Sequence, residues 1–155
     1  VLSSQRVDVN DALYNASRGK EQAKDDAANP MVQHGLKLIP SVTRVFPVDR
    51  TLYVFLQAYE KDKAAEENAG SAAPTAVKPT PLFAYVSFYR DQKMALETPP
   101  IAVAPEAATR LGVVPLNFQV AVGKLAPGEY QCQVSVLDPA GRRAAFWQGP
   151  VMLVP

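Results

Sequence analysis

Alternation of apolar and polar residues with a period of two is the feature that most constrains how this chain folds. In the last third of the sequence, every second position is apolar and the positions between are mostly polar. The apolar positions are Val114, Leu116, Phe118 and Val120, and then Tyr130, Cys132, Val134 and Val136. Successive side chains of a β-strand point to opposite faces of a sheet. The pattern therefore predicts two strands, each with one buried face.

Turn signals follow these strands. Asp138-Pro-Ala-Gly141 has the residues that a type I turn prefers, and Pro127-Gly128 fits the central pair of a type II turn, where glycine tolerates positive φ. Further strands are predicted over residues 5–9, 52–59, 81–89, 94–97, 101–104, 142–147 and 151–154. Gly149-Pro150 is expected to break the chain between the last two.

The remaining segments are less regular. Residues 36–39 and 42–46 flank Pro40 and are expected to form one bent edge strand, because proline cannot donate a ladder hydrogen bond. Polar stretches without an apolar stripe are typical of loops and connectors. The expected irregular elements are a helical turn over 11–16, a solvated connector over 17–29, a long exposed loop over 60–80 and a short helix over 106–110.

Short strands at roughly 8- to 12-residue spacing, without a long amphipathic helix, are typical of an antiparallel β-sandwich. The expected fold class is all-β, immunoglobulin-like or fibronectin III-like, with a partly irregular N-terminal segment. The chain has 155 residues, of which 48% are hydrophobic, so one domain can bury a core of its own. We expect residues 1–29 to be an extension and residues 30–155 to be the sandwich.

Tyr130 refines this expectation. In immunoglobulin-like sandwiches, a tyrosine two residues before a strand cysteine closes a corner by a hydrogen bond from its hydroxyl to the backbone. Tyr130, preceded by Gly128 and followed by Cys132, fits this arrangement. The partner cysteine is missing, so Cys132 is expected to be a small buried hydrophobe. Trp147 lies too late in the chain to be the usual strand C tryptophan, which leaves strict immunoglobulin topology open.

Composition excludes several classes of protein and site. The net charge of +1 argues against a nucleic-acid or anionic-membrane surface. No apolar run approaches the roughly 20 residues that a spanning helix needs, so no membrane span is expected. One cysteine and one histidine exclude a disulfide framework and a structural zinc site. The chain opens on Val1 without a secretion signal, which suggests a piece excised from a longer protein.

The chemistry-bearing residues favour structural roles. His34 is expected in an exposed loop, and a thiol in the middle of a strand, as at Cys132, is usually inert. Asp25-Asp26 and Glu66-Glu67 lie in polar connectors and are interpreted as solvated charge. Phosphate-loop, dinucleotide-binding and hydrolase motifs are absent from the sequence. We therefore expect no catalytic residue and no cofactor.

Three aspartates lie in predicted turns, namely Asp49, Asp91 and Asp138. Aspartate side chains in turns commonly hydrogen-bond the nearby backbone. A calcium site built from such loops is a weaker alternative, because the sequence lacks the D-x-D-x-D-G run of ligands. No metal site is predicted.

Aromatic residues are the main feature of the sequence that indicates a binding surface. Tyr53 and Tyr59, together with Phe55, share one face of their strand, and Tyr85 and Tyr89 share a face of the next with Phe83. If the two strands pair, these side chains form a contiguous patch that could take a glycan, a peptide or a neighbouring domain. The alternative is burial of the patch under the other sheet or under residues 1–30.

Several strand sequences together resemble the C-terminal region of the exported "VWFA-related" (von Willebrand factor A-related) proteins of acidobacteria. The likeness rests on LIPSVTRVF (38–46), LYVFLQAY (52–59), FYR (88–90) with ETPP (97–100), LAPGEYQCQVSVLD (125–138) and AAFW (144–147). It spans most of residues 29–155, and residues 1–16 resemble the junction to a preceding module.

The resemblance implies an extracytoplasmic protein with a metal-binding A-like domain upstream. The D-x-S-x-S metal motif of that domain is absent here, so no functional residue transfers. We expect a non-enzymatic interaction module whose partners are neighbouring domains of the same chain or another protein. The alternative is a carbohydrate-binding or adhesion module that uses an aromatic strand face.

Overall fold

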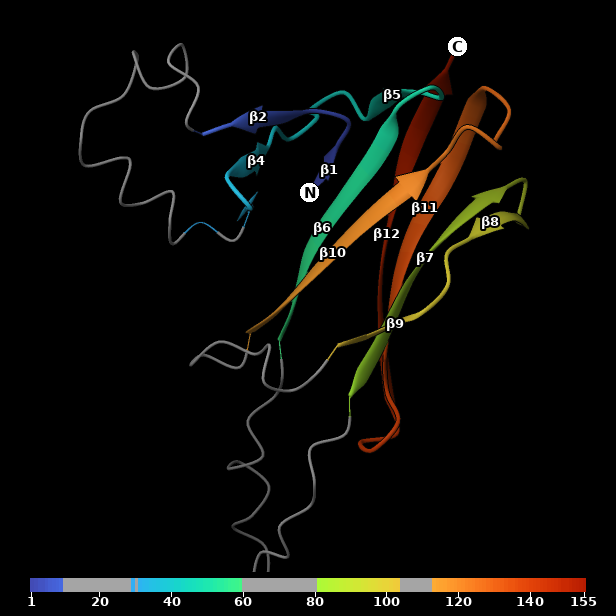
Figure 1. Cartoon of the computed structure of the whole chain (residues 1–155). Helices are drawn as coiled ribbons and strands as arrows, with labels where there is room; N and C mark the ends of the chain where they lie inside the picture. Colours follow the sequence, from blue (N-terminus) through green and yellow to red (C-terminus); the bar gives the residue numbers. More distant parts are fainter. Residues whose placement is uncertain (10–28, 30, 60–80, 104–112) are drawn as a thin grey trace, which may run out of the picture.

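The computed structural model describes residues 1–9, 29, 31–59, 81–103 and 113–155. The regular structure in these residues is all β, with no helix in the part described, and the sheets are mostly antiparallel. Two sheets packed face to face form a sandwich, and a small third sheet lies beside it (Figure 1). The all-β antiparallel sandwich predicted from the alternation is consistent with this arrangement.

The first layer, called sheet I, is three-stranded with the order β1-β6-β10. Its strands are β1 (Leu2–Ser3), β6 (Thr51–Tyr59) and β10 (Val113–Ala121). β6 pairs antiparallel with both neighbours, with Leu56 opposite Leu116 and Val54 opposite Leu2. The N-terminal residues thus form an edge of the sandwich itself, a pairing that the sequence did not predict.

The second layer, called sheet II, is six-stranded with the order β5-β12-β11-β7-β8, and β9 also pairs with β7. Its strands are β5 (Val45–Pro47), β7 (Leu82–Arg90), β8 (Lys93–Glu97), β9 (Ile101–Val103), β11 (Gly128–Asp138) and β12 (Arg143–Val154). All pairs are antiparallel except β5 with β12. In Figure 1, β6 and β10 lie in front of β12, and β11 and β7 are seen to their right.

The hydrophobic core lies between these two layers, because the alternation turns one side of every strand inward. Its largest fully buried side chains are Phe46, Phe88, Leu52, Leu116 and Leu153, with a group of valines and Cys132 between them. Every buried side-chain nitrogen or oxygen of the described residues has a hydrogen-bond partner. Burial of apolar surface without unpaired polar groups is the main source of stability in such a sandwich.

The third sheet, called sheet III, has the order β2-β4-β3. Its strands are β2 (Arg6–Asp8), β3 (Val32–Gln33) and β4 (Leu36–Leu38), and β2 matches the strand predicted over 5–9. The guanidinium of Arg6 lies 4.2 Å from the centre of the Tyr53 ring on β6. Sheet III therefore covers part of the outer face of sheet I.

Two strand predictions need correction. Residues 36–39 and 42–46, expected as one bent edge strand, contribute to different sheets, since β4 lies in sheet III and β5 in sheet II. Pro40 and a positive φ of 56° at Arg44 lie between them. The expected break at Gly149-Pro150 is also wrong, because β12 runs through it.

The reason for the unbroken strand is the direction of the backbone groups. The Met152 amide donates to the Arg44 carbonyl, 2.9 Å away, on the side of β12 opposite β11. Backbone groups alternate in direction along a strand. The N–H that proline lacks would, at position 150, have pointed away from β11. The hydrogen bonds between β11 and β12 are therefore unaffected.

The sequence also predicts a hairpin-type connection at residues 90–93, and both this turn and the one predicted at 138–141 are present. Asp91 and Gln92 both have positive φ, 50° and 62°, as a type I′ turn requires. Between β10 and β11 the chain turns at Val122–Leu125, where the Leu125 amide donates to the Val122 carbonyl at 2.9 Å, and not at Pro127-Gly128. The helices predicted at 11–16 and 106–110, the connector up to 28 and the loop 60–80 lie outside the described residues.

Candidate functional site

The Tyr130 side chain closes the corner between β10 and β11. Its hydroxyl donates a hydrogen bond to the Ala126 carbonyl at 2.8 Å, and only 3% of the residue is exposed. The Arg90 guanidinium lies 5.5 Å from the ring centre, where a cation–π contact is favourable. Gly128 has φ of 143°, and a Cβ there would lie 3.0 Å from Arg90 Nη2. Both Tyr130 and Gly128 thus make contacts that stabilise this corner.

Trp147 packs against the core from β12, opposite Val134 on β11. The Arg44 guanidinium lies 6.0 Å from its ring centre. A Cβ at Gly149 would come within 2.8 Å of the indole, so the glycine makes room for the ring. Trp147 is therefore a structural residue of sheet II with one side toward the edge of the sandwich.

The predicted aromatic patch is not contiguous. β6, with Tyr53 and Tyr59, pairs with β1 and β10 in sheet I. β7, with Tyr85 and Tyr89, pairs with β11, β8 and β9 in sheet II. Because the even-numbered neighbours of these residues fill the core, the tyrosines of the two strands face outward on opposite sides of the sandwich. The premise that the strands pair is wrong.

Burial differs along the outer face of β6. Phe55 is buried, and Tyr53 is half-buried beneath Arg6, as the alternative of cover by the N-terminal residues predicts. Tyr59, at the end of the strand, is 74% exposed. Of this set, only Tyr59 presents its ring freely to solvent.

The outer face of sheet II combines half-buried aromatic rings with a row of hydrogen-bonding side chains. The row runs across four strands through Glu97, Ser87, Gln133 and Gln148. Ser87 Oγ donates to Glu97 Oε2 at 2.9 Å, and Gln148 Nε2 donates to Gln133 Oε1 at 2.5 Å. Tyr85 and Tyr89 flank Ser87 on β7. The sequence did not identify this row, because neighbours across strands depend on the register.

Exposed apolar side chains lie on the same outer face. Phe146 is 72% exposed and Met94 is 59% exposed, and Leu137 and Met152 are exposed as well. Apolar groups clustered on one exposed face commonly mark a contact surface.

The reactive groups lie apart from one another. Cys132 is fully buried in the core, and burial raises the pKa of its thiol to about 12. His34 is exposed in the turn between β3 and β4 of sheet III, with a positive φ of 51°. The thiol is therefore protonated at neutral pH and shielded from solvent, as the sequence predicted for a cysteine inside a strand.

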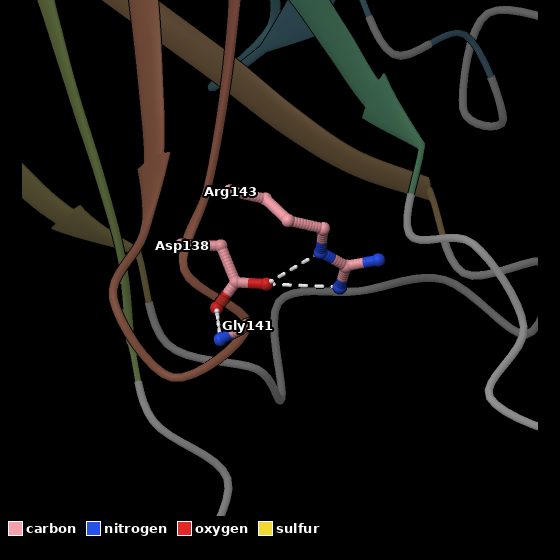
Figure 2. A network of polar contacts seen from close by, with 3 residues as sticks. All are labelled: Asp138, Gly141 and Arg143. Atoms are coloured by element: carbon pink, nitrogen blue, oxygen red, sulfur yellow. Dashed lines mark hydrogen bonds and ion pairs between the residues drawn. The ribbon is translucent and has the colours of Figure 1, made fainter.

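The three turn aspartates are separated as well. Asp49 precedes β6, Asp91 lies between β7 and β8, and Asp138 ends β11. Asp138 accepts the Gly141 amide through Oδ1 at 2.9 Å and the Arg143 guanidinium through Oδ2 at 2.9 Å (Figure 2). Within the described ranges no three His, Cys, Asp or Glu side chains are grouped as metal ligands. The carboxylate pairs at 25–26 and 66–67 fall outside those ranges.

An apolar cleft opens at one side of the sandwich, between β6 and β12. Its volume is about 400 Å³. Residues 56–59 of β6 and 143–147 of β12 form its two sides, and the interior is lined by Leu82, Leu116 and Val136. We call it the edge cleft. Alternation alone does not reveal it, because it arises where two strands of different sheets have no neighbour among the described strands.

Comparisons with protein families, with curated proteins and with solved structures find no significant match to this chain. In the part of the chain that the structure describes, no helix is long and apolar enough to cross a membrane.

Proposed function

We propose that this chain is a non-enzymatic, immunoglobulin-like β-sandwich module that makes contacts with proteins. Its partners are neighbouring domains of the same chain or another protein. The observation that carries the proposal is the outer face of sheet II, where Phe146 on β12 and Met94 on β8 are exposed. Exposed apolar groups on a rigid scaffold favour recognition over chemistry.

The immunoglobulin-like part of the proposal has two supports. In immunoglobulin-like domains the strands G, F and C are neighbours in one sheet, and B and E are neighbours in the other. The orders β12-β11-β7 and β6-β10 correspond to these sets. The second support is the Tyr130 corner at the start of β11, the strand that corresponds to F.

The buried thiol supports the non-enzymatic part, since Cys132 is neither ionised nor accessible as a nucleophile. The resemblance to VWFA-related proteins supports a place in an exported, extracytoplasmic multidomain bacterial protein. Detection of the protein in extracytoplasmic fractions tests that location. A hydrolytic activity abolished by His34→Ala would contradict the non-enzymatic assignment.

Photo-cross-linking tests the contact surface. The chain has three methionines, and photo-methionine replaces all of them in cells that produce the protein. Met94 and Met152 lie on the outer face of sheet II, whereas Met31 belongs to the sheet III region and is an internal control. We expect cross-links to protein from Met94 and Met152. Cross-links from neither position would overturn the proposal.

A carbohydrate-binding role is the second candidate. It is favoured by the row Glu97, Ser87, Gln133 and Gln148 beside Tyr85 and Tyr89, since sugars bind through hydrogen bonds and ring stacking. On a glycan array, Tyr85→Ala should abolish binding at this face. Tyr59→Ala is the matched control, because Tyr59 lies on the other sheet. Binding that is indifferent to Tyr85→Ala excludes the candidate.

A further inference from the structure

Among the described residues, the edge of β12 opposite β11 has a partner strand only at residues 152–154. β5 pairs only with residues 152–154. There the Met152 amide donates to Arg44 and the Val154 carbonyl accepts from Val48, both at 2.9 Å and both on the side away from β11. The register between β11 and β12 has no shift, so Ala144, Phe146 and Gln148 direct their backbone N–H and C=O groups to this same side.

The facing edge of β6 pairs with β1 beside Tyr53 and Val54. The Phe55 amide donates to the Val1 carbonyl at 2.8 Å, which shows that the backbone groups of Phe55 point away from β10. The register with β10 is continuous to Tyr59. The backbone groups of Gln57 and Tyr59 therefore also point away from β10, and no described strand pairs with them.

The edge cleft lies between these two free edges. Consecutive residues line it on both sides, 56–59 on β6 and 143–147 on β12. Side chains of one strand face alternate sides of a sheet. Consecutive residues can line one cleft only where it runs along the edge of the strand, so an occupant would meet backbone groups as well as apolar side chains.

We propose that an extended peptide segment of a partner protein binds in the edge cleft as an added strand along β12. The proposal rests on the proposed contact function and names the class of partner. Backbone hydrogen bonds to residues 144, 146 and 148 would hold the segment, and its alternate apolar side chains would fill the cleft. The added strand would continue the ladder that β5 begins at residues 152–154.

Two arginine side chains indicate which charge the ends of the bound peptide should carry. Arg143, at one end of the free edge, uses only Nε and Nη2 to bind Asp138. Arg44, at the other end, lies over Trp147, and no carboxylate of the described residues forms an ion pair with it. The two guanidinium groups complement a segment with acidic residues at both ends.

Amide exchange measured by NMR tests whether the edge is free. In the unliganded protein, the amides of Ala144, Phe146 and Gln148 should exchange quickly, and those of Ala145 and Trp147, which face β11, should be protected. Protection of both sets would mean that the chain itself or a second copy already occupies the edge, and it would overturn the proposal.

Binding is tested with a fluorescent probe peptide, Asp-Val-Thr-Val-Thr-Val-Asp, blocked at both ends. We expect it to protect the amides of Ala144 and Phe146. N-methylation of the peptide at alternate residues, in two frames, should abolish binding in one frame only, because only one set of N–H groups faces β12. Binding that tolerates both frames, or no binding, would overturn the proposal.

A pair of protein variants completes the test. Ala144→Pro removes an N–H from the free edge, a change that Pro150 already shows to be compatible with β12. It should weaken binding about fivefold or more, the factor expected for one hydrogen bond. Ala144→Val, which keeps the N–H, should bind normally, and equal affinity of the two variants would contradict strand addition. If the probe peptide does not bind but the photo-methionine cross-links are still found, only the added strand is rejected and the proposed contact function remains supported.

Discussion

The hydroxyl of Tyr130 shows how one atom secures a corner of the fold. It donates to the Ala126 carbonyl at 2.8 Å from a nearly buried position, next to the Arg90 guanidinium. Without that donor, the Ala126 carbonyl would lose its side-chain partner. The stability of the β10–β11 corner therefore depends on a hydrogen bond as well as on the ring.

Tyr130→Phe should lower the free energy of unfolding by about 1 kcal/mol, because it removes this hydrogen bond and keeps the packing of the ring. Urea denaturation measures the change. Tyr53→Phe is the matched control, since the described residues give the Tyr53 hydroxyl no hydrogen bond and its ring contact with Arg6 remains. An equal effect of the two substitutions would argue against the corner.

Cys132 gives a prediction for pH. Burial raises the pKa of the thiol from 9.0 to about 12, so the unfolded chain loses this proton at lower pH than the folded one. Its contribution to stability is complete below pH 9 and is lost as the pH rises toward 12. The unfolding free energy should fall by about 1 kcal/mol more in the wild type than in Cys132→Ala between about pH 8 and 10. Parallel pH profiles of the two proteins would refute this.

Among the elements, the β7–β8 hairpin carries local strain. Asp91 and Gln92 both adopt positive φ in its two-residue turn. Glutamine is unfavourable in the left-handed region, whereas glycine is the preferred second residue of a type I′ turn. The turn was predictable from position, but its strain is visible only in the backbone angles.

Gln92→Gly should raise the free energy of unfolding by about 0.5 kcal/mol, because relief of the positive φ exceeds the greater entropy of glycine in the unfolded chain. Thermal or urea denaturation measures the gain. Gln92→Ala removes the same side chain without relieving the backbone, and it should give no gain. A stabilised alanine variant would show that the backbone angle is not the cause.

At the scale of the whole molecule, two short strands from early in the chain, β1 and β5, form edges of the two sheets of the sandwich. β1 and β5 each pair with only a few residues of their neighbours, yet Leu2 and Phe46 are both buried in the core. Short edge strands thus contribute mainly through the side chains that they insert between the sheets. The same shortness leaves the edge cleft open below them.

Phe46→Ala should lower the free energy of unfolding by about 3 to 5 kcal/mol, because it leaves a cavity in the core where β5 closes sheet II. Phe146→Ala removes the same group from an exposed position and should change stability by less than about 0.5 kcal/mol. Urea denaturation of both variants measures the contrast. Similar losses would contradict the assignment of inner and outer faces.

Prediction from sequence was most reliable where the evidence is local. The strands around Leu56 and Val134 followed from alternation, and the strand around Val86 followed from its β-branched and aromatic residues. The Tyr130 corner followed from a short motif. The aromatic patch and the continuity of β12 at Pro150 were predicted wrongly, because both depend on which strand lies beside which.

The sequence by itself determined where the strands run and which side chains of each face inward, because the alternation is a property of consecutive residues. Only the tertiary structure decided that β6 and β7 belong to opposite layers, which set their tyrosines apart. It also decided which parts of the β6 and β12 edges have no partner among the described strands. Pairing joins residues far apart in the chain, and many registers satisfy the same local pattern of alternation.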